Sequence, residues 1–366
     1  MNGMDAFLEA KGWLALLAPL VSALLVLALI APARRFGMVD HPGGRKNHDH
    51  PTPLVGGLAI FLAFLIVNAL AGAIPGGSQS LLAAMAVTVV VGVLDDAHEI
   101  GHRSKFFAQI AAALLVATGT SVHMTHFGDL FGLGDIELGK WAPLVTVVSI
   151  VGLMNAINMI DGVDGLAGSV VLPPLLILAA LAAGDGNVRV AFELLALAGA
   201  VAGFLFFNLR SPWRARAAAF MGDTGGLLLG LLLAWYSIIL AGNDKAPICP
   251  IAAVWILAVP LLDMGSVMLL RLFQGQSPFH ADRQHLHYVL LDAGYTVGQV
   301  VALMSAVSLA FGLLPLLAHN AGASQSALFL AFLVVWGGYW LALARPGRTV
   351  RVASLVVKPR LLGTGD

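Results

Sequence analysis

Long apolar runs separated by short polar segments make up most of the sequence. One helix needs about 20 apolar residues to cross a bilayer core about 30 Å thick. Runs of about that length occupy residues 13–33, 54–73, 80–94, 104–122, 141–158, 165–183, 190–208, 222–241, 247–271, 295–317 and 324–344. Because these runs are continuously apolar rather than alternating, they argue against a β-barrel. The pattern predicts an all-α polytopic integral membrane protein with about eleven transmembrane helices.

Two of the runs, 80–94 and 141–158, are short and adjoin polar motifs. We therefore expect the helices at these two places to be tilted or broken. The sequence shows no strong internal repeat and no separate soluble domain. We expect a single transmembrane domain over residues 1–345, followed by a basic cytoplasmic tail over residues 346–366.

Most of the Lys and Arg residues fall in alternate loops of this arrangement. The loops 34–53, 95–103, 159–164, 209–221 and 272–294, with their span ends and the tail from residue 345, together hold 16 of the 20, whereas the other side carries Lys11, Lys140, Arg189 and Lys245. Because cytoplasmic loops carry the excess of positive charge, we expect an N-terminus outside the cell and a cytoplasmic C-terminus. The first run follows acidic residues and precedes Arg34-Arg35, which fits a retained helix better than a cleaved signal peptide.

The composition supports a membrane protein and excludes other classes. Of the 366 residues, 59% are hydrophobic and 11% are charged, whereas soluble domains carry about 25% charged residues. Lys and Arg number 20, as do Asp and Glu, so no basic excess indicates a nucleic-acid partner. Cys249 is the only cysteine, which excludes an internal disulfide and a CxxC metal site. The function must come from the few polar residues that interrupt the apolar runs.

Carboxylates interrupt or border the apolar runs on the predicted cytoplasmic side. They are Asp95, Asp96, Asp161, Asp164, Asp223 and Asp263. A carboxylate in the middle of a transmembrane helix costs about 2.5–3.5 kcal/mol, and such groups usually face a cavity, a partner or an ion. Helix capping explains one or two of these residues but not all of them on one side. We therefore expect a polar site at the cytoplasmic ends of the helices.

The segment LDDAHEIG contains the adjacent carboxylates Asp95 and Asp96, with Glu99 close behind. Adjacent carboxylates repel each other, so keeping both ionised needs a cation or basic partners nearby. Two interpretations are equally open at this point. The pair serves a metal or catalytic site, or it caps and pairs with the helix that starts at Arg103–Lys105.

Two further segments combine carboxylates with glycines. In NAINMIDGVDGLAG, Asn158, Asp161 and Asp164 offer oxygens that suit a hard cation such as Mg²⁺, which usually also takes phosphate oxygens of a substrate. A glycine-rich turn with Asp caps is the alternative. In FMGDTGG, the glycines around Asp223 let backbone N–H groups approach an anion at the start of a helix. Asp223 could equally be a plain N-cap.

Histidines gather in SPFHADRQHLH, which contains His280, His285 and His287. Their spacing suggests zinc, but no cysteine accompanies them, and the Asp and Asn residues elsewhere favour magnesium. An arginine among histidines also suits the phosphates of a nucleotide, and we favour that interpretation over zinc. A basic segment, RKNHDHPTPLVGG, adds Lys46 and His48, either as a binding loop or as a solvated positive loop.

The segments RKNHDHPTPLVGG, LDDAHEIG, NAINMIDGVDG, FMGDTGG and SPFHADRQHLH stand in the order found in one known family. Over nearly its whole length the chain resembles the polyprenyl-phosphate N-acetylhexosamine-1-phosphate transferases (glycosyltransferase family 4), and within them the bacterial WecA-type enzymes. The resemblance implies an enzyme that transfers an N-acetylhexosamine 1-phosphate, with GlcNAc 1-phosphate favoured, from a UDP-sugar to undecaprenyl phosphate and releases UMP. It implies Mg²⁺ as the cofactor, with Mn²⁺ as a substitute, and makes residues 1–345 a catalytic domain.

The resemblance also implies roles for individual residues. Catalytic roles fall to Asp95, Asp96, Asp161, Asp164, His280, Arg283, His285 and His287. Substrate binding falls to Lys46, His48, Asn208, Phe220, Arg283 and His285, with Phe220 stacking on uracil. The positions linked to magnesium are Asp223 and Asn158.

The implied setting is the bacterial cytoplasmic (inner) membrane, with the site on the cytoplasmic face and an apolar groove between helices for the prenyl chain. The implied step is the first membrane step of O-antigen, lipopolysaccharide or related glycan synthesis. The implied partners are a UDP-N-acetylhexosamine, undecaprenyl phosphate, membrane lipids and a second copy in a homodimer. We expect direct in-line attack by the lipid phosphate, with a phospho-aspartate intermediate as the alternative. Another UDP-acetamido sugar is an alternative donor, and a membrane transporter is an alternative function.

Overall fold

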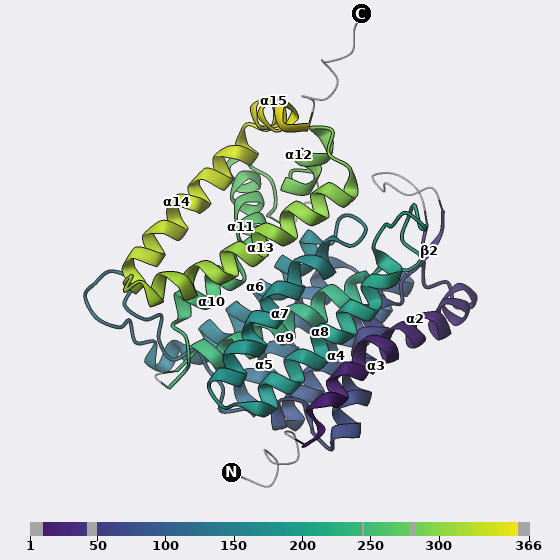
Figure 1. Ribbon diagram of the computed structural model, residues 1–366, viewed down its shortest axis with the longest axis horizontal. Coiled ribbons are helices and arrows are strands. Elements are labelled where there is room, and N and C mark those ends of the chain that lie inside the picture. The colour runs from purple at the N-terminus through teal and green to yellow at the C-terminus, as the bar shows by residue number, and fades with distance from the viewer. Residues whose placement is uncertain (1–9, 42–49, 244, 279–282, 358–366) are drawn as a thin grey trace, which may run out of the picture.

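The computed structural model describes residues 10–41, 50–243, 245–278 and 283–357 (Figure 1). Almost all of the regular structure is helical. The helices are η1 (Gly12–Leu17), α2 (Ala18–Arg35), α3 (Gly56–Ala71), η2 (Pro75–Gly77), α4 (Gln79–His98), α5 (His102–Gly119), η3 (Gly139–Trp141), α6 (Ala142–Ile160), α7 (Leu166–Gly184), α8 (Val188–Asn208), α9 (Gly222–Ala241), α10 (Pro250–Ile256), α11 (Ala258–Phe273), α12 (Leu286–Asp292), α13 (Val297–Asn320), α14 (Gln325–Ala344) and α15 (Pro346–Val357). Two short strands, β1 (Val39–Asp40) and β2 (Thr52–Pro53), pair antiparallel beside the bundle.

The fold confirms the predicted all-α polytopic membrane protein. Within the described residues, eight helices are long and apolar enough to cross a membrane, or up to nine if one bent pair counts as a single span. The run 54–73 forms the shorter apolar helix α3, and the run 104–122 forms α5. Every predicted run therefore lies on a helix, while the exact number of spans and the orientation of the termini stay predictions.

One helix is broken, but not where the sequence suggested. The run 247–271, expected to be one span, forms α10 and α11, whose axes are bent by 84°. Pro260 lies four residues beyond Ile256, the last residue of α10. Because proline has no N–H, the carbonyl of Ile256 loses its helical hydrogen bond, and the proline ring crowds the preceding turn. The expected breaks in 80–94 and 141–158 are wrong, since α4 and the η3–α6 segment are continuous over 20 and 22 residues.

Helix α9 lies at the centre of the bundle, and 94% of its most apolar window is buried. Glycines make this close packing possible. A Cβ on Gly57 of α3 would lie 2.1 Å from the backbone nitrogen of Gly225, and a Cβ on Gly230 would lie 2.3 Å from the Cα atom of Met154 in α6. Small residues let helix backbones approach closely inside a membrane. The N-terminal turn of α9 is thereby held among α3, α4 and α6.

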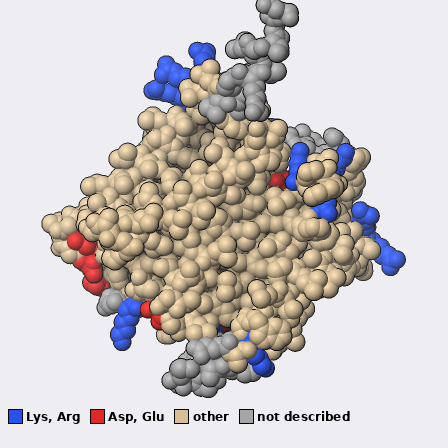
Figure 2. All heavy atoms as spheres, viewed as in Figure 1, with Lys and Arg blue, Asp and Glu red and all other residues tan. Residues whose placement is uncertain are grey.

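The surface of the protein is divided into an apolar belt and two charged ends. Figure 2 shows a broad band without Lys, Arg, Asp or Glu across the middle of this face, with charged side chains gathered beyond it on either side. Large apolar side chains such as Leu195, Val334 and Leu341 are exposed on membrane-length helices. The described chain starts with η1 at one end of the bundle and finishes with α15 at the other (Figure 1).

Candidate active site

The predicted polar residues converge on one cavity of about 560 Å³ at the ends of α4, α6 and α9. Its lining includes the predicted site residues Asp95, Asp96, Asn158, Asp161, Asp164, Asn208, Phe220, Asp223 and Arg283, together with Glu99. These residues come from segments that are far apart in the sequence and are brought together by the packing of α9 against its neighbours. Lys46, His48 and His280 lie outside the described residues.

Asp96 caps the N-terminus of α9 from a different helix. Its carboxylate accepts hydrogen bonds from the backbone N–H groups of Asp223 (2.8 Å) and Thr224 (3.2 Å) and from the Thr224 hydroxyl (2.7 Å). The first N–H groups of a helix have no partner within the helix, so an external carboxylate stabilises them. Gly222 has a φ of +71°, and a Cβ there would lie 2.5 Å from the Asp96 carboxylate. Asp223 is therefore not the N-cap of its own helix, and its side chain is available to the cavity.

A lysine joins two of the carboxylates in this cavity. Lys105, in the first turn of α5, places its Nζ atom 2.9 Å from Asp95 Oδ2 and 2.6 Å from Asp223 Oδ2. The side chain of Asn158 also hydrogen-bonds to Asp223. The pairing alternative for the LDDAHEIG segment is thus correct for Asp95 and Lys105. It does not remove Asp95 from the site, because the same lysine connects it to Asp223.

Asp161 carries a negative charge that its surroundings disfavour. It follows the last residue of α6 and lines the cavity. Burial raises the pKa of the Asp161 carboxyl to about 7. The negative charges of Asp223, Asp96 and Asp164 act on this pKa in the same direction. A cation in the cavity would relieve this repulsion.

The donor atoms at this point of the cavity fit a hard divalent cation. Asp223 offers a carboxylate, and the side chain of Asn158 hydrogen-bonds to it. Hard cations prefer carboxylate and amide oxygens. Within the described residues, no three His, Cys, Asp or Glu side chains form a complete metal site. One carboxylate and one amide suit Mg²⁺, because this ion usually takes one or two carboxylates and completes its shell with water and substrate phosphate.

Asp164 and Asn208 hold the loops that form the cavity wall. The Asp164 carboxylate accepts hydrogen bonds from Arg210 Nε (2.7 Å) and from the backbone N–H of Ala217 (3.2 Å). The Asn208 amide accepts from the backbone N–H of Gly165 (2.8 Å) and donates to the carbonyl of Ala219 (2.9 Å). Both ends of the Asn208 side chain are bonded to backbone, so its contribution to any ligand is to fix the shape of the wall.

Phe220 is held in the cavity wall by its own backbone. Its N–H donates to the carbonyl of Pro53, and its carbonyl accepts from the N–H of Gly56, both at 2.9 Å. Leu54 and Phe220 form a parallel bridge between these two segments. The half-buried ring lines the cavity, so it offers an apolar face to a planar ligand. Residues 53–56 thereby become part of the cavity wall.

The histidine segment divides into an arginine on the cavity and two buried histidines. Arg283 lines the cavity, with its guanidinium carbon 4.7 Å from the ring centre of Tyr288. His285 is 5% exposed, and its Nδ1 atom lies 2.5 Å from Asp263 Oδ2. His287 is 0% exposed and packs against Gly162, where a Cβ would lie 2.3 Å from its Nε2 atom. Neither histidine lines the cavity, so both hold the segment in place behind it.

Sequence reasoning missed Lys105 and Tyr288 as parts of the site. Lys105 had a visible signal, because it opens the helix that follows the acidic pair. Tyr288 had none, since a tyrosine beside an apolar run is ordinary in a membrane protein. Asp263 was expected to face a cavity or an ion. In the structure it is buried and accepts hydrogen bonds from the Leu286 N–H and the Tyr339 hydroxyl as well as pairing with the histidine.

Because His287 is buried as a neutral ring, the protein should lose stability in mild acid. Burial lowers the pKa of His287 to about 4, against about 6.5 in an unfolded chain. Between pH 6.5 and pH 4 the unfolded state binds a proton that the folded state does not. The free energy of unfolding therefore decreases by up to about 3 kcal/mol as the pH falls through this range. Thermal unfolding of the detergent-solubilised protein at pH 7.5, 6 and 5 measures this loss.

The matched variant is His287→Gln, which cannot take up a proton. It should lose clearly less stability than the wild type between pH 7.5 and 5, whatever its stability at pH 7.5. The raised pKa of Asp161 acts in the opposite direction, since its folded form takes up a proton first, and it is common to both proteins. Equal pH dependence in the two proteins would show that His287 does not titrate as its burial indicates.

Comparison with known proteins places this arrangement among described enzymes. A profile described as glycosyl transferase family 4 matches residues 78–241, which extend from the start of α4 to the end of α9. The chain is 30% identical to the undecaprenyl-phosphate alpha-N-acetylglucosaminyl 1-phosphate transferase of Haemophilus influenzae, over 92% of this chain and 96% of that one. It is 31% identical to the protein of the same name from Pasteurella multocida, over 92% and 95% of the two chains. For the Escherichia coli K12 protein of that name the identity is 29%, over 88% of each chain.

Proposed function

Because this chain belongs to glycosyl transferase family 4, we propose that it transfers GlcNAc 1-phosphate from UDP-GlcNAc to undecaprenyl phosphate. The products are undecaprenyl-diphosphate-GlcNAc and UMP. The names of the relatives that align over about nine-tenths of the chain support the sugar and the acceptor. The observation that carries the proposal is the convergence of Asp95, Asp161 and Asp223 with Lys105 at the ends of apolar helices.

The reaction brings two anionic groups together, so its main problem is electrostatic. In phosphoryl transfer the protein mainly positions the reactants and neutralises their charge. Arg283 lies on the cavity and can offer a planar fork of N–H donors to a phosphate. Lys105 supplies a second positive charge beside Asp95 and Asp223. The protein thus provides an arginine that lines the cavity and a lysine paired with two of the cavity's carboxylates.

Asp223 and Asn158 would hold Mg²⁺, or Mn²⁺ in its place, next to this space. The ion, when bound, neutralises charge on the diphosphate and polarises the phosphorus that is attacked. Asp95 is connected to the same position through Lys105. The Asp223 side chain does not cap its own helix, so its carboxylate, which also pairs with Lys105, faces the site of the ion while Asp96 keeps the helix end in place.

The hydrogen bonds of Asp96 argue against this residue as the nucleophile of a covalent intermediate. A carboxylate that accepts bonds from the Asp223 N–H and from both the N–H and the hydroxyl of Thr224 is a poor nucleophile, which disfavours a covalent intermediate on this residue. The acceptor needs little help to react, because a phosphate monoester with a second pKa near 6 is mostly a dianion at pH 7. Direct attack inverts the configuration at phosphorus, whereas a covalent intermediate retains it.

The setting follows from the substrates. A nucleotide sugar is made in the cytosol, and a prenyl chain resides in the bilayer, so a site at the cytoplasmic ends of helices reaches both. The protein would therefore reside in the bacterial cytoplasmic membrane with its cavity facing the cytosol. The apolar belt in Figure 2 and the membrane-length helices support this placement.

The decisive experiment uses the purified protein, undecaprenyl phosphate and a panel of UDP-sugars that includes UDP-GlcNAc, UDP-GalNAc and UDP-glucose. UMP release should require both the lipid and Mg²⁺ and should be fastest with UDP-GlcNAc. Chelation of the metal should stop the reaction, and Mn²⁺ should restore it in part. Faster turnover with UDP-GalNAc would change the assigned sugar. No UMP release with any donor would refute the proposed function.

Loss of the Phe220 ring should weaken binding of the nucleotide more than it slows chemistry. Stacking of a base on an aromatic ring is worth about 1–3 kcal/mol, so Phe220→Ala should raise the KM for UDP-GlcNAc about tenfold or more. The KM for undecaprenyl phosphate should change little. Phe220→Tyr keeps the ring and is the matched control. If the KM for UDP-GlcNAc is the same in the alanine variant and the wild type, the stacking role is wrong.

A further inference from the structure

The segment between α8 and α9 presents a tryptophan at the tip of a tight turn. The Ser211 N–H donates to the Arg214 carbonyl (2.8 Å), and the Arg214 N–H donates to the Ser211 carbonyl (2.9 Å). Pro212 presets the backbone angle that such a turn needs, so Pro212 and Trp213 lie at its tip. The Trp213 side chain is 93% exposed. An aromatic side chain displayed in this way indicates a contact outside the chain.

The turn folds back against an exposed stripe of α8, formed by Leu195, Ala202 and Phe206. These residues are seven and four positions apart, so they share one face of a membrane-length helix, and that face is turned toward lipid. The guanidinium carbon of Arg214 lies 5.3 Å from the ring centre of Phe206, and the guanidinium donates to the Phe206 carbonyl. The turn therefore lies beside the lipid-facing stripe, next to the last residues of α8.

The segment that carries the turn is basic. Residues 209–221 include Arg210, Arg214 and Arg216 and no Asp or Glu. Arg210 is paired with Asp164, whereas within the described part of the chain neither Arg214 nor Arg216 forms an ion pair. Guanidinium groups bind phosphates, and indole rings favour the depth of lipid headgroups. The combination suits the surface of a bilayer.

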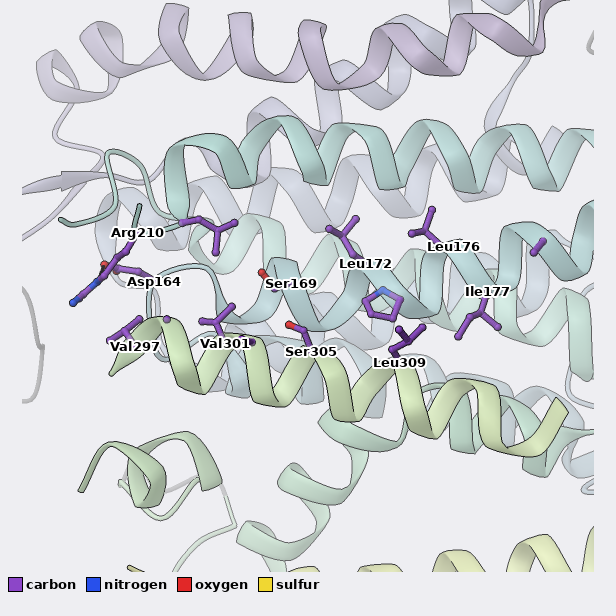
Figure 3. Close-up of a pocket in the computed structure, with 15 residues that line it drawn as sticks. Asp164, Ser169, Leu172, Leu176, Ile177, Arg210, Val297, Val301, Ser305 and Leu309 are labelled. Carbon is purple, nitrogen blue, oxygen red and sulfur yellow. Dashed lines mark hydrogen bonds and ion pairs between the residues drawn. The ribbon is translucent and has the colours of Figure 1, made fainter. Parts of the chain in front are cut away.

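The base of the turn is bonded to the wall of the acidic cavity. The Asp164 carboxylate accepts from Arg210 Nε at 2.7 Å (Figure 3) and from the Ala217 N–H at 3.2 Å, on the two sides of the turn. Asp164 and Arg210 line the cavity and also line a groove of about 670 Å³ between α7 and α13 that leads into it (Figure 3). The turn and this part of the cavity wall are therefore held together.

We propose that residues 210–216 bind anionic phospholipid headgroups of the surrounding bilayer, with Trp213 at headgroup depth and Arg214 and Arg216 on lipid phosphates. The anchored turn holds the cavity wall at the membrane surface. A bilayer is favoured over a soluble partner because the turn lies beside the lipid-facing stripe of α8. Anionic headgroups are favoured over zwitterionic ones because the segment has positive charge and no carboxylate of its own.

A fluorescent reporter in the turn tests the proposal in bilayer discs. Cys249, the only cysteine, is replaced by alanine, and the exposed Ala215 is replaced by a cysteine that carries a nitrobenzoxadiazole group. Doxyl-labelled phosphatidylglycerol should quench this reporter at least about twofold more strongly than doxyl-labelled phosphatidylcholine at the same mole fraction, because each arginine near the membrane attracts anionic lipid. A doxyl group near the headgroup should quench more than one at the end of the acyl chain. Equal quenching by the two lipids, or stronger quenching from the chain end, would overturn the proposal.

Removal of charge from the turn should abolish the preference between the two lipids. Arg214→Gln/Arg216→Gln should bring the ratio of quenching by the two lipids close to one. The matched control is Arg348→Gln/Arg351→Gln, which removes the same charge from exposed positions on α15, a helix that packs against α12 and α14. It should keep the ratio of the unmodified turn. Equal loss in both double variants would attribute the preference to the overall charge of the protein and would contradict a site at the turn.

Salt provides a test that needs no change in the turn's arginines. At about 1 M salt the screening length is about 3 Å, so the preference for phosphatidylglycerol should disappear. A preference that is unchanged at this salt concentration would show that charge does not cause it and would refute the proposal.

The role of the indole is tested separately. Trp213→Ala should lose most of the quenching by doxyl groups near the headgroup, because the turn then lacks its interfacial side chain. Trp141→Ala, which removes an exposed tryptophan before α6 at the opposite end of the bundle, is the control and should leave the quenching unchanged. If Trp213→Ala is quenched as strongly as the control, the tryptophan does not hold the turn in the headgroup layer and the proposed anchor is wrong.

Discussion

Replacing Asp223 by Asn should reduce kcat by about 10²- to 10³-fold, the usual cost of removing one electrostatic stabiliser of a transition state. The substitution removes the negative charge that lies against Lys105 and Asn158. It leaves the backbone N–H of residue 223 in place, so the cap that Asp96 provides to α9 is retained. UMP release from UDP-GlcNAc and undecaprenyl phosphate at saturating Mg²⁺ measures the effect.

The control for this variant is Asp292→Asn, which removes an exposed carboxylate at the end of α12 that does not itself line the cavity. It should keep wild-type activity. Thermal unfolding of Asp223→Asn should show a folded protein, since the cap of α9 does not use this side chain. If Asp223→Asn retains more than about a tenth of the wild-type kcat, Asp223 does not hold the metal.

Replacing Lys105 by Met should lower both activity and stability. The variant leaves Asp95 and Asp223 close together without the ammonium group that lies 2.9 Å from one and 2.6 Å from the other. Breaking a buried ion pair costs about 3–5 kcal/mol. Because the side chains of Lys105 and Asp95 are 17% and 11% exposed, we expect a somewhat smaller loss, about 2 kcal/mol of unfolding free energy. Activity should fall about a hundredfold.

A double variant separates charge repulsion from simple loss of a side chain. In Asp95→Asn/Lys105→Met, one of the two repelling carboxylates is neutral. The double variant should therefore lose less unfolding free energy than the sum of the losses in the two single variants. Mg²⁺ should raise the melting temperature of Lys105→Met more than that of the wild type, because the ion then replaces a missing positive charge. Lys140→Met, at an exposed site before α6, is the control and should change neither property. Additive effects in the double variant would contradict the proposed electrostatic link.

The broad features of the fold followed from the apolar pattern because a helix must satisfy its own backbone hydrogen bonds inside a bilayer. Each predicted run therefore became helical, although the run 247–271 forms two helices. The break in the run 247–271 was missed although Pro260 stood in it, because prolines such as Pro173 and Pro315 lie inside unbroken helices of the same chain. Whether a proline breaks a helix depends on the partners that neighbouring helices offer to the freed carbonyl.

The candidate site was predicted in part. The carboxylates and Asn158 stood out because polar groups beside apolar runs are costly and need a reason to be there. Lys105 was foreseen as a partner of the acidic pair, but the partners that lie far away in the sequence did not stand out. Asp96 caps a helix that starts 126 residues later in the chain, at Gly222, and His285 is paired with Asp263 from a different helix. Such pairs depend on which helices pack together, and no local spacing encodes that.

The sequence by itself determined that this chain is a helical membrane protein and that acidic and amide oxygens collect at one end of its helices. Both properties are local, since they follow from the length of each apolar run and from the residues that end it. The tertiary structure alone decided that Lys105 joins two carboxylates, that the histidines lie behind the cavity and that a groove leads into it. These features depend on close helix contacts at residues such as Gly57 and Gly230, and on hydrogen bonds such as Ser308 to Val170, which exist only once the helices are packed.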